Sequence, residues 1–203
     1  LLNELIIQEN KIIQALYDDF KKPAFESVLT ETSYVIVELK DTIKNLKNWA
    51  KPKRVFPSIL NFPSTDYIYK EPYGKVLIIA PWNYPFQLLF TPLIGAIAGG
   101  NCVVLKPSEF APATAQVMSK IIESLFPANY IMYLEGEGAT VLPPLLTQNR
   151  FDHIFYTGST QVGKIIYKYA AEQLVPVTLE LGGKSPAVIA SDANLRVAAR
   201  RLA

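Results

Sequence analysis

The chain has 203 residues, of which 50% are apolar and 11% aromatic, a composition that predicts an ordered domain with a large buried core. Its 20 basic and 18 acidic residues give a net charge of +2 without a basic cluster, so we do not expect a nucleic-acid partner. One cysteine, Cys102, rules out an internal disulfide and favours a reducing, cytoplasmic location. Together with the single histidine, His153, it also rules out a His/Cys zinc site, and we expect no metal.

The two ends of the sequence do not read as natural termini. The first residues, Leu1 to Glu4, lack an initiator methionine and the basic region of a signal peptide. The last ten, from Asn194, have the pattern of an interrupted amphipathic helix. We therefore expect the front part of a longer enzyme.

The first third of the chain is predicted to be mostly helical. Apolar residues recur at helical spacing over residues 1–20 and again over 24–50, with Pro23 between them. A proline-punctuated segment follows, and alternating polar and aromatic residues at 64–70 predict a short strand or hairpin arm. Residues 75–106 lack charge between the two lysines, but their prolines and polar residues argue against a membrane span in this part of the chain.

From residue 74 onward, short apolar runs alternate with helical patterns. This alternation predicts a Rossmann-like parallel α/β sheet with flanking helices, whose ligands bind beyond the carboxyl ends of the strands. The predicted strands are 75–80, 102–105, 130–133, 153–156 and 177–181, and the predicted helices are 86–98, 114–126 and 161–172.

Glu180 is the most informative residue of the sequence. It lies between two leucines at the end of a predicted strand, and a glycine pair follows at once, which lets backbone approach a ligand. We expect this carboxylate to be partly desolvated and to act as a general base. No convincing nucleophile accompanies it: Cys102 and His153 both begin predicted strands, the wrong end for chemistry, and we interpret Cys102 as a small buried apolar residue.

Three further segments follow predicted strands. Asn83, in the turn Ala80-Pro-Trp-Asn-Tyr-Pro-Phe86, could donate its amide to an oxyanion or could cap a helix. Lys106 and Glu109 could contact ribose or phosphate, or could lie at the surface before a capped helix. Glycines at 158 and 163 open a helix whose N-terminus could receive a phosphate, although the spacing is not a standard dinucleotide or P-loop motif.

Taken together, these segments resemble the aldehyde dehydrogenase superfamily. The resemblance rests on four motifs in family order: Pro-Trp-Asn-Tyr-Pro at 81–85, Lys-Pro-Ser-Glu at 106–109, Phe-Tyr-Thr-Gly-Ser at 155–159 with Gly163, and Leu-Glu-Leu-Gly-Gly-Lys at 179–184. The short helical N-terminus and Pro-Phe-Gln-Leu at 85–88 are most similar to the class 3 group, which takes medium-chain, fatty and aromatic aldehydes.

The resemblance implies a division of the chain and a role for each motif. Residues 1–57 would be helices packed on the coenzyme domain, 58–72 an oligomerisation arm of a homodimer, 73–182 the dinucleotide-binding domain, and 183–203 the start of a second α/β catalytic domain. Glu180 would be the general base for deacylation and Asn83 the oxyanion donor. The coenzyme, NAD or NADP, would contact Pro81, Trp82, Lys106, Glu109, Gly158, Ser159, Thr160, Gln161, Val162, Gly163, Leu181 and Gly182.

By the same resemblance, the nucleophilic cysteine would lie downstream of this sequence, which alone would bind nucleotide weakly and not oxidise an aldehyde. Two alternative functions are also compatible with parts of the sequence. An acylating or acyl-phosphate-type reductase has the same fold but needs no water-activating base, and Glu180 argues against it. A non-catalytic nucleotide-binding protein would explain the missing cysteine, and the pair of Asn83 and Glu180 argues against that. The aldehyde and the choice between NAD and NADP stay open.

Overall fold

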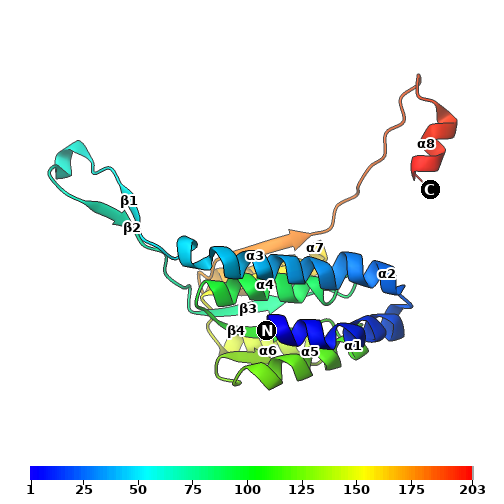
Figure 1. The fold of residues 1–203 in the computed structure, drawn as a ribbon, viewed down its shortest axis with the longest axis horizontal. Helices are drawn as coiled ribbons and strands as arrows, with labels where there is room; N and C mark the ends of the chain where they lie inside the picture. The colour runs from blue at the N-terminus through cyan, green and yellow to red at the C-terminus, as the bar shows by residue number, and fades with distance from the viewer. Residues whose placement is uncertain (203) are drawn as a thin grey trace.

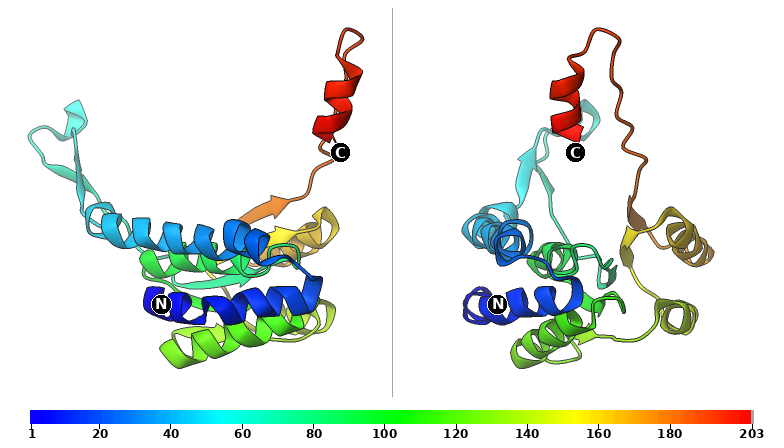
Figure 2. Two further views of the ribbon diagram at one scale, coloured as in Figure 1. Left: turned by 45° about the vertical axis from the view of Figure 1, so that its right-hand side comes forward. Right: turned by 90° about the vertical axis from the view of Figure 1, so that its right-hand side faces the viewer.

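The structure, a computed structural model that describes residues 1–202, contains a five-stranded parallel sheet in the order β5-β4-β3-β6-β7. Figure 1 shows the fold as a ribbon, and the right-hand view of Figure 2 shows the sheet between two layers of helices. The Rossmann-like α/β prediction is therefore confirmed, with each predicted strand within two residues of its observed bounds. The strands are β3 (Lys75–Ile79), β4 (Cys102–Lys106), β5 (Ile131–Tyr133), β6 (His153–Gly158) and β7 (Val177–Leu181).

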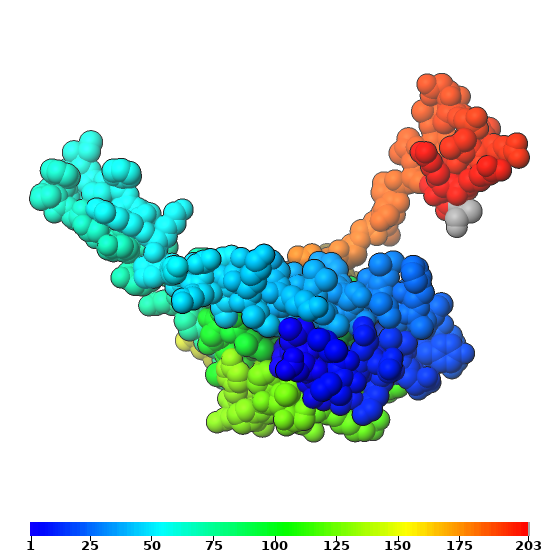
Figure 3. Space-filling view, viewed as in Figure 1, coloured from blue at the N-terminus to red at the C-terminus, as the bar shows by residue number. Residues whose placement is uncertain are grey.

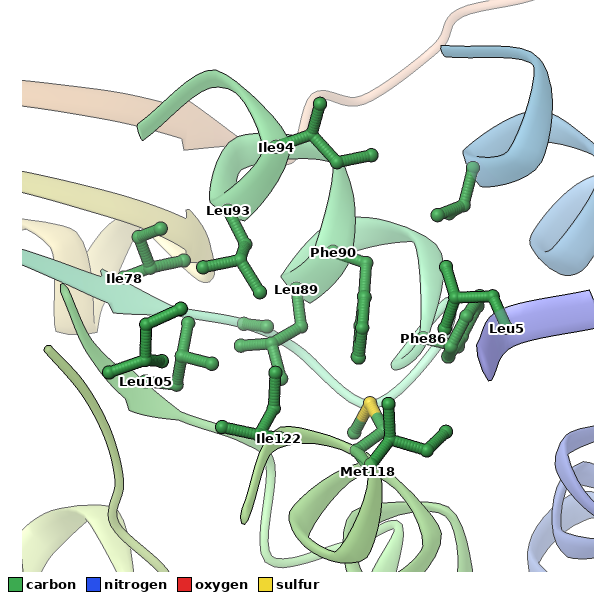
Figure 4. Packing of buried hydrophobic residues seen from close by; sticks show 14 of the residues in the cluster. Leu5, Ile78, Phe86, Leu89, Phe90, Leu93, Ile94, Leu105, Met118 and Ile122 are labelled. Carbon is green, nitrogen blue, oxygen red and sulfur yellow. The ribbon is translucent and has the colours of Figure 1, made fainter. Parts of the chain in front are cut away.

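Side chains of the central strands alternate between the two faces of the sheet. Val76 and Ile78 of β3 pack against α4 (Gln87–Ala98) and α5 (Pro112–Leu125), in the core shown in Figure 4. Leu77 and Ile79 face the opposite layer, which contains α6 (Gly138–Gln148) and α7 (Thr160–Glu172). Both faces of the sheet are covered, which explains the nearly continuous apolar runs of the sequence.

Helices at the N-terminus add a further layer beside α4 and α5. Helix α1 (Leu2–Phe20) packs on α5, and α3 (Ser33–Trp49) packs on α4. The predicted helix over 24–50 is interrupted: α2 (Ala24–Ser27) passes through one π-helical turn, η1 (Val28–Thr32), into α3. The consecutive residues Glu31 and Thr32 of that turn are both buried.

Two segments project from this body, as Figures 2 and 3 show. One is a hairpin in which β1 (Lys53–Val55) pairs antiparallel with β2 (Asp66–Ile68), joined through the 3₁₀ turn η2 (Ile59–Asn61). The other is the exposed chain that follows β7 and ends in α8 (Leu195–Leu202). The hairpin confirms the predicted strand near 64–70, and its first strand precedes the 58–72 range expected for the arm.

Two further features of the fold differ from the predictions. Helix α6 was not predicted, because Pro143 and Pro144 lie within it and obscure its helical pattern. Cys102, interpreted as buried, is exposed, because it is the first residue of β4, before the strand enters the core. Within residues 1–202, no helix is both long and apolar enough to cross a membrane.

Candidate functional site

The candidate site lies where the chain reverses its direction across the sheet. Strands β3, β4 and β5 follow one another outward on one side, and β6 and β7 occupy the other. In open α/β sheets such a switch point forms a ligand crevice beyond the carboxyl ends of the strands. Two clefts open there, and residues that follow β3 and end β6 line both: Pro81, Trp82, Thr157, Gly158 and Ser159.

The first cleft encloses about 570 Å³ between β3, β4, α6 and α7. Lys106 and Glu109 line one wall, and Val162 and Ile165 line the α7 wall. Val162 and Ile165 are 39% and 54% exposed, so an apolar surface faces the opening. An apolar slot beside an acidic group suits a nucleoside, whose base is flat and whose ribose offers hydroxyl donors.

Lys106 and Glu109 form an ion pair in this wall. The Lys106 ammonium is buried and donates to Glu109 Oε2 at 3.1 Å and to the carbonyl of Pro107 at 2.6 Å. Glu109 Oε1 accepts from the N–H of Gly138 at 2.8 Å. Desolvation alone would raise the pKa of Glu109, but the hydrogen bonds from Gly138, from its own N–H and from Lys106 outweigh it and lower the pKa. Glu109 is therefore a fixed negative charge on the wall of the cleft.

The N-terminus of α7 reaches the same cleft. Ser159 caps the helix by accepting a hydrogen bond from the N–H of Val162 at 3.3 Å. Gly158 leaves no space for a side chain, since a Cβ there would lie 2.7 Å from Cζ of Tyr156. The close backbone, the helix N-terminus and the adjacent apolar slot fit a dinucleotide, with its pyrophosphate at α7. Thr160 and Gln161 are exposed on the first turn of α7 and line neither cleft.

The second cleft, of about 930 Å³, contains both predicted catalytic residues. Asn83 enters it from the turn after β3, and Glu180 enters from β7, where it pairs with Thr157 of β6. Leu181 and Gly182 line it as well. Glu180 is exposed, so the expected desolvation is absent from the described chain. The physical reason is its position on an edge strand, after which the chain leaves the body of the domain.

Two residues that sequence reasoning missed hold the Asn83 turn from behind. Lys22 is buried and donates to Glu31 Oε1 at 2.7 Å. Glu31 Oε2 accepts from the N–H groups of Phe86 and Gln87, at 3.1 and 2.9 Å. Burial raises the pKa of Glu31, and hydrogen bonds from Lys22, Gln87 and Phe86 offset part of that rise. A glutamate at an apolar position of a predicted helix was the only signal available.

The remaining candidates lie away from the clefts. Cys102 and His153 are the first residues of β4 and β6, so they lie at the amino ends of the strands, opposite the carboxyl ends formed by Lys106 and Gly158. His153 stacks on Tyr73 with ring centroids 4.8 Å apart, and its Nε2 is 3.1 Å from Thr178 Oγ1. Gly163 lies on the buried face of α7, where it permits close packing against Leu181 and Tyr156. Residues 1–202 contain no acidic, histidine or cysteine cluster suited to a metal ion.

The parallel sheet with paired clefts at its switch point defines a Rossmann-like α/β domain. Residues 2–203 match the family model described as the aldehyde dehydrogenase family, and the chain belongs to that family. The resemblance inferred from the four motifs is thereby confirmed.

Several characterised relatives match over nearly the whole chain. It is 50% identical over 194 residues to 4,4'-diaponeurosporen-aldehyde dehydrogenase of Staphylococcus aureus, covering 96% of this chain and 42% of the relative. It is 44% identical over 200 residues to the dimeric NADP-preferring aldehyde dehydrogenase of Rattus norvegicus, covering 98% and 44%. The solved structure of substrate-bound Staphylococcus aureus AldH superposes with a TM-score of 0.90 at 47% identity, covering 99% and 44%. The chain thus spans less than half the length of these relatives.

Proposed function

We propose that this chain is the coenzyme-binding portion of an NAD(P)-dependent aldehyde dehydrogenase that oxidises an aldehyde to a carboxylic acid. The observation that carries the proposal is the position of Asn83 and Glu180 in one cleft, directly beside a second cleft that fits a dinucleotide. The reaction would pass through a thioester on a cysteine downstream of this sequence. The share of each relative that the chain covers, 42% and 44%, supports a longer parent protein.

In this proposal, Asn83 and Glu180 act at successive stages. Asn83 donates its side-chain amide to the oxygen of the aldehyde when the thiolate attacks and the oxygen becomes negative. Glu180 takes a proton from the water that hydrolyses the thioester. Its exposure in this chain leaves it accessible to water, and residues of the missing part would cover it.

When bound, NAD or NADP would supply the hydride acceptor for the aldehyde carbon. Lys106 and Glu109 would hold the adenosine ribose and Val162 would lie against the adenine. The segment from Gly158 to Gly163 would run along the pyrophosphate, with Ser159 as the N-cap of α7 and Thr160 and Gln161 on its first turn. Pro81 and Trp82 flank the coenzyme where the two clefts meet. Leu181 and Gly182 contact the nicotinamide through backbone. The position of Pro81 and Trp82 in both clefts supports a ligand that spans them.

The same proposal includes the assembly and the domains of the parent protein. The hairpin would serve as the arm of a homodimer, which its exposed apolar residues support, as does the dimeric name of the rat relative. Residues 1–57 would pack on the dinucleotide-binding domain, 73–182, and residues 183–203 would begin the catalytic domain. The single cysteine of the chain supports a cytoplasmic location.

The experiment that tests this function is aldehyde-dependent reduction of NAD and NADP by the full-length protein, beside its Glu180→Gln variant, with the acid product quantified. We expect the parent protein to make acid and the variant to stall after one burst of NADH. Turnover only with coenzyme A or phosphate would favour an acylating or acyl-phosphate reductase. Absence of turnover without an added acceptor, with coenzyme A and with phosphate would favour a non-catalytic nucleotide-binding protein.

A second experiment uses the isolated 203-residue chain. We expect it to bind nucleotide weakly and not to oxidise aldehydes, because its one cysteine begins β4, at the sheet edge opposite the clefts. Any turnover that survives the Cys102→Ser substitution would mean that another group of this chain performs the chemistry.

A further inference from the structure

We propose that Lys22 and Glu31 are positioning residues that hold Asn83 in place for its role at the oxyanion, an inference that rests on the proposed function. Neither residue lines the second cleft. Both come from the N-terminal helices and contact the backbone of the turn that carries Asn83. They would therefore act through that turn and not on the substrate.

The carboxylate of Glu31 fixes the far end of this turn. Its Oε2 accepts the backbone N–H groups of Phe86 and Gln87, which begin α4. The first N–H groups of a helix have no partner within the helix, so an acidic side chain from another element satisfies them and favours the positive end of the helix. Glu31 thereby fixes the point at which the turn enters α4.

The ammonium of Lys22 fixes the middle of the same turn, at Asn83 and Tyr84. It donates to Glu31 Oε1 at 2.7 Å and to the carbonyl oxygen of Asn83 itself at 3.3 Å. It also lies 4.2 Å from the ring centroid of Tyr84, the residue after Asn83, in a cation–π contact. Lys22 thus holds the backbone of the residue whose side chain enters the cleft.

Burial of this pair indicates that it does more than stabilise the fold. Glu31 is fully buried and Lys22 is 8% exposed. A buried ion pair is weak evidence for stability, since an apolar pair of similar volume is often equally stable, so we attribute this pair to the backbone groups that it holds. Residues 1–202 contain two ion pairs: Lys106 and Glu109 line the first cleft, and Lys22 and Glu31 contact the backbone of the turn that carries Asn83.

The π-helical turn supplies the geometry that the pair needs. It lies within η1, Val28–Thr32, and brings both Glu31 and its neighbour Thr32 into the interior. A π turn inserts an extra residue into an α-helix and is frequent at functional sites. Here it aims the glutamate at the start of α4, while Thr32 donates to Glu9 of α1 at 2.6 Å.

A double-mutant cycle in the full-length enzyme tests the inference. Lys22→Met is made in the native and in the Asn83→Ala background, and the rate of the first NADH burst is measured with each. In the native background we expect a loss of about 10- to 100-fold, up to the range seen when an oxyanion donor is removed. In the Asn83→Ala background we expect less than about a twofold loss, because residues that act as one unit are not additive.

Since Lys22→Met leaves the Glu31 carboxylate buried without its partner, the cycle is repeated with Lys22→Met/Glu31→Gln. This variant removes both charges and keeps an amide oxygen for Phe86 and Gln87. Lys22→Arg should restore part of the rate. Lys21→Met is the matched control, since Lys21 is the exposed neighbour and should leave the burst unchanged. Coenzyme dissociation constants should stay within about twofold throughout, because Lys22 and Glu31 line neither cleft and Lys22 contacts the backbone of Asn83, which is not among the proposed coenzyme contacts.

The outcomes separate this inference from the proposed function. Equal losses in both backgrounds would mean a general structural role, and an unchanged burst in the native background would mean that Asn83 needs no such support; either result overturns the inference and leaves the proposed function standing. If Asn83→Ala alone has no effect on the burst, the oxyanion role and the positioning inference both fail.

Discussion

The carboxylate of Glu109 lies 2.8 Å from the backbone N–H of Gly138, so an acidic residue after β4 caps the first turn of α6 across the cleft. Lys106 holds its other oxygen at 3.1 Å. Glu109 is therefore fixed from two sides, and its lowered pKa keeps it ionised at neutral pH. Any ligand placed at this wall meets a charge that can move only if the Gly138 contact breaks.

This charge leads to a prediction about coenzyme preference. The 2′-phosphate of NADP, if the ribose lies at Glu109, would be repelled, whereas the hydroxyl of NAD would donate to the carboxylate. We expect Glu109→Gln to raise the affinity for NADP relative to NAD by about tenfold, equivalent to roughly 1–2 kcal/mol of charge repulsion near the surface. Calorimetric titration of both coenzymes would measure the ratio. Glu135→Gln, whose side chain lies outside the cleft, is the control, and an unchanged ratio in Glu109→Gln would remove the ribose from this wall.

A second prediction concerns the backbone at the end of β6. A Cβ at Gly158 would lie 2.7 Å from Cζ of Tyr156, a buried ring, whereas a Cβ at Gly183 has nothing within 4 Å. We expect Gly158→Ala to lower the free energy of unfolding by about 1–3 kcal/mol, the usual cost of overpacking, and to weaken coenzyme binding. Gly183→Ala should leave the free energy of unfolding unchanged. Urea unfolding compares the two variants, and similar stability for both would mean that Tyr156 moves freely.

The sequence predicted the sheet because its strands are buried on both faces. Runs such as Val76–Ile79 and Val103–Leu105 are continuous and apolar, which is typical of strands in a parallel sheet covered on both faces. The rule that ligands bind beyond the carboxyl ends of parallel strands singled out Asn83, Glu109 and Gly158, and all three line the clefts of the structure. Burial at the ends of strands was harder to predict. Cys102 begins β4 before that strand enters the core, and Glu180 lies near the end of β7, where the chain leaves the core.

The support behind the site could not be predicted in this way. Lys22 and Glu31 are nine residues apart in the sequence, yet they meet Asn83 and Phe86, more than fifty residues further on. Their spacing has no local signature, because the π turn that directs Glu31 inward follows no simple periodicity. Only the packing of the N-terminal helices against α4 shows what the charges do.

The single histidine gives a prediction for pH dependence. Burial lowers the pKa of His153 below the ordinary histidine value of about 6.5. The unfolded chain therefore binds more protons than the folded one, and this residue's contribution to stability is present above pH 6.5 and is lost as the pH falls through the folded-state pKa. We expect the melting temperature of the native protein to fall relative to that of His153→Gln as the pH is lowered from 7.5 to about 5. A difference that does not vary with pH would contradict the assignment.

The last prediction concerns the projecting hairpin. Phe56, Ile59 and Leu60 are 100%, 94% and 95% exposed, a degree of apolar exposure that usually marks an interaction site. If the hairpin is a dimer arm, a charge at its tip would be buried without a partner in the interface, which costs more than the lost apolar contact. We expect Leu60→Glu to convert the full-length dimer into a monomer, measured by sedimentation velocity over a range of concentrations. Ile7→Glu is the matched control, since Ile7 is 71% exposed on α1, far from the hairpin along the chain. If Leu60→Glu stays dimeric while Ile7→Glu dissociates, the interface lies on the N-terminal helix and not on the hairpin.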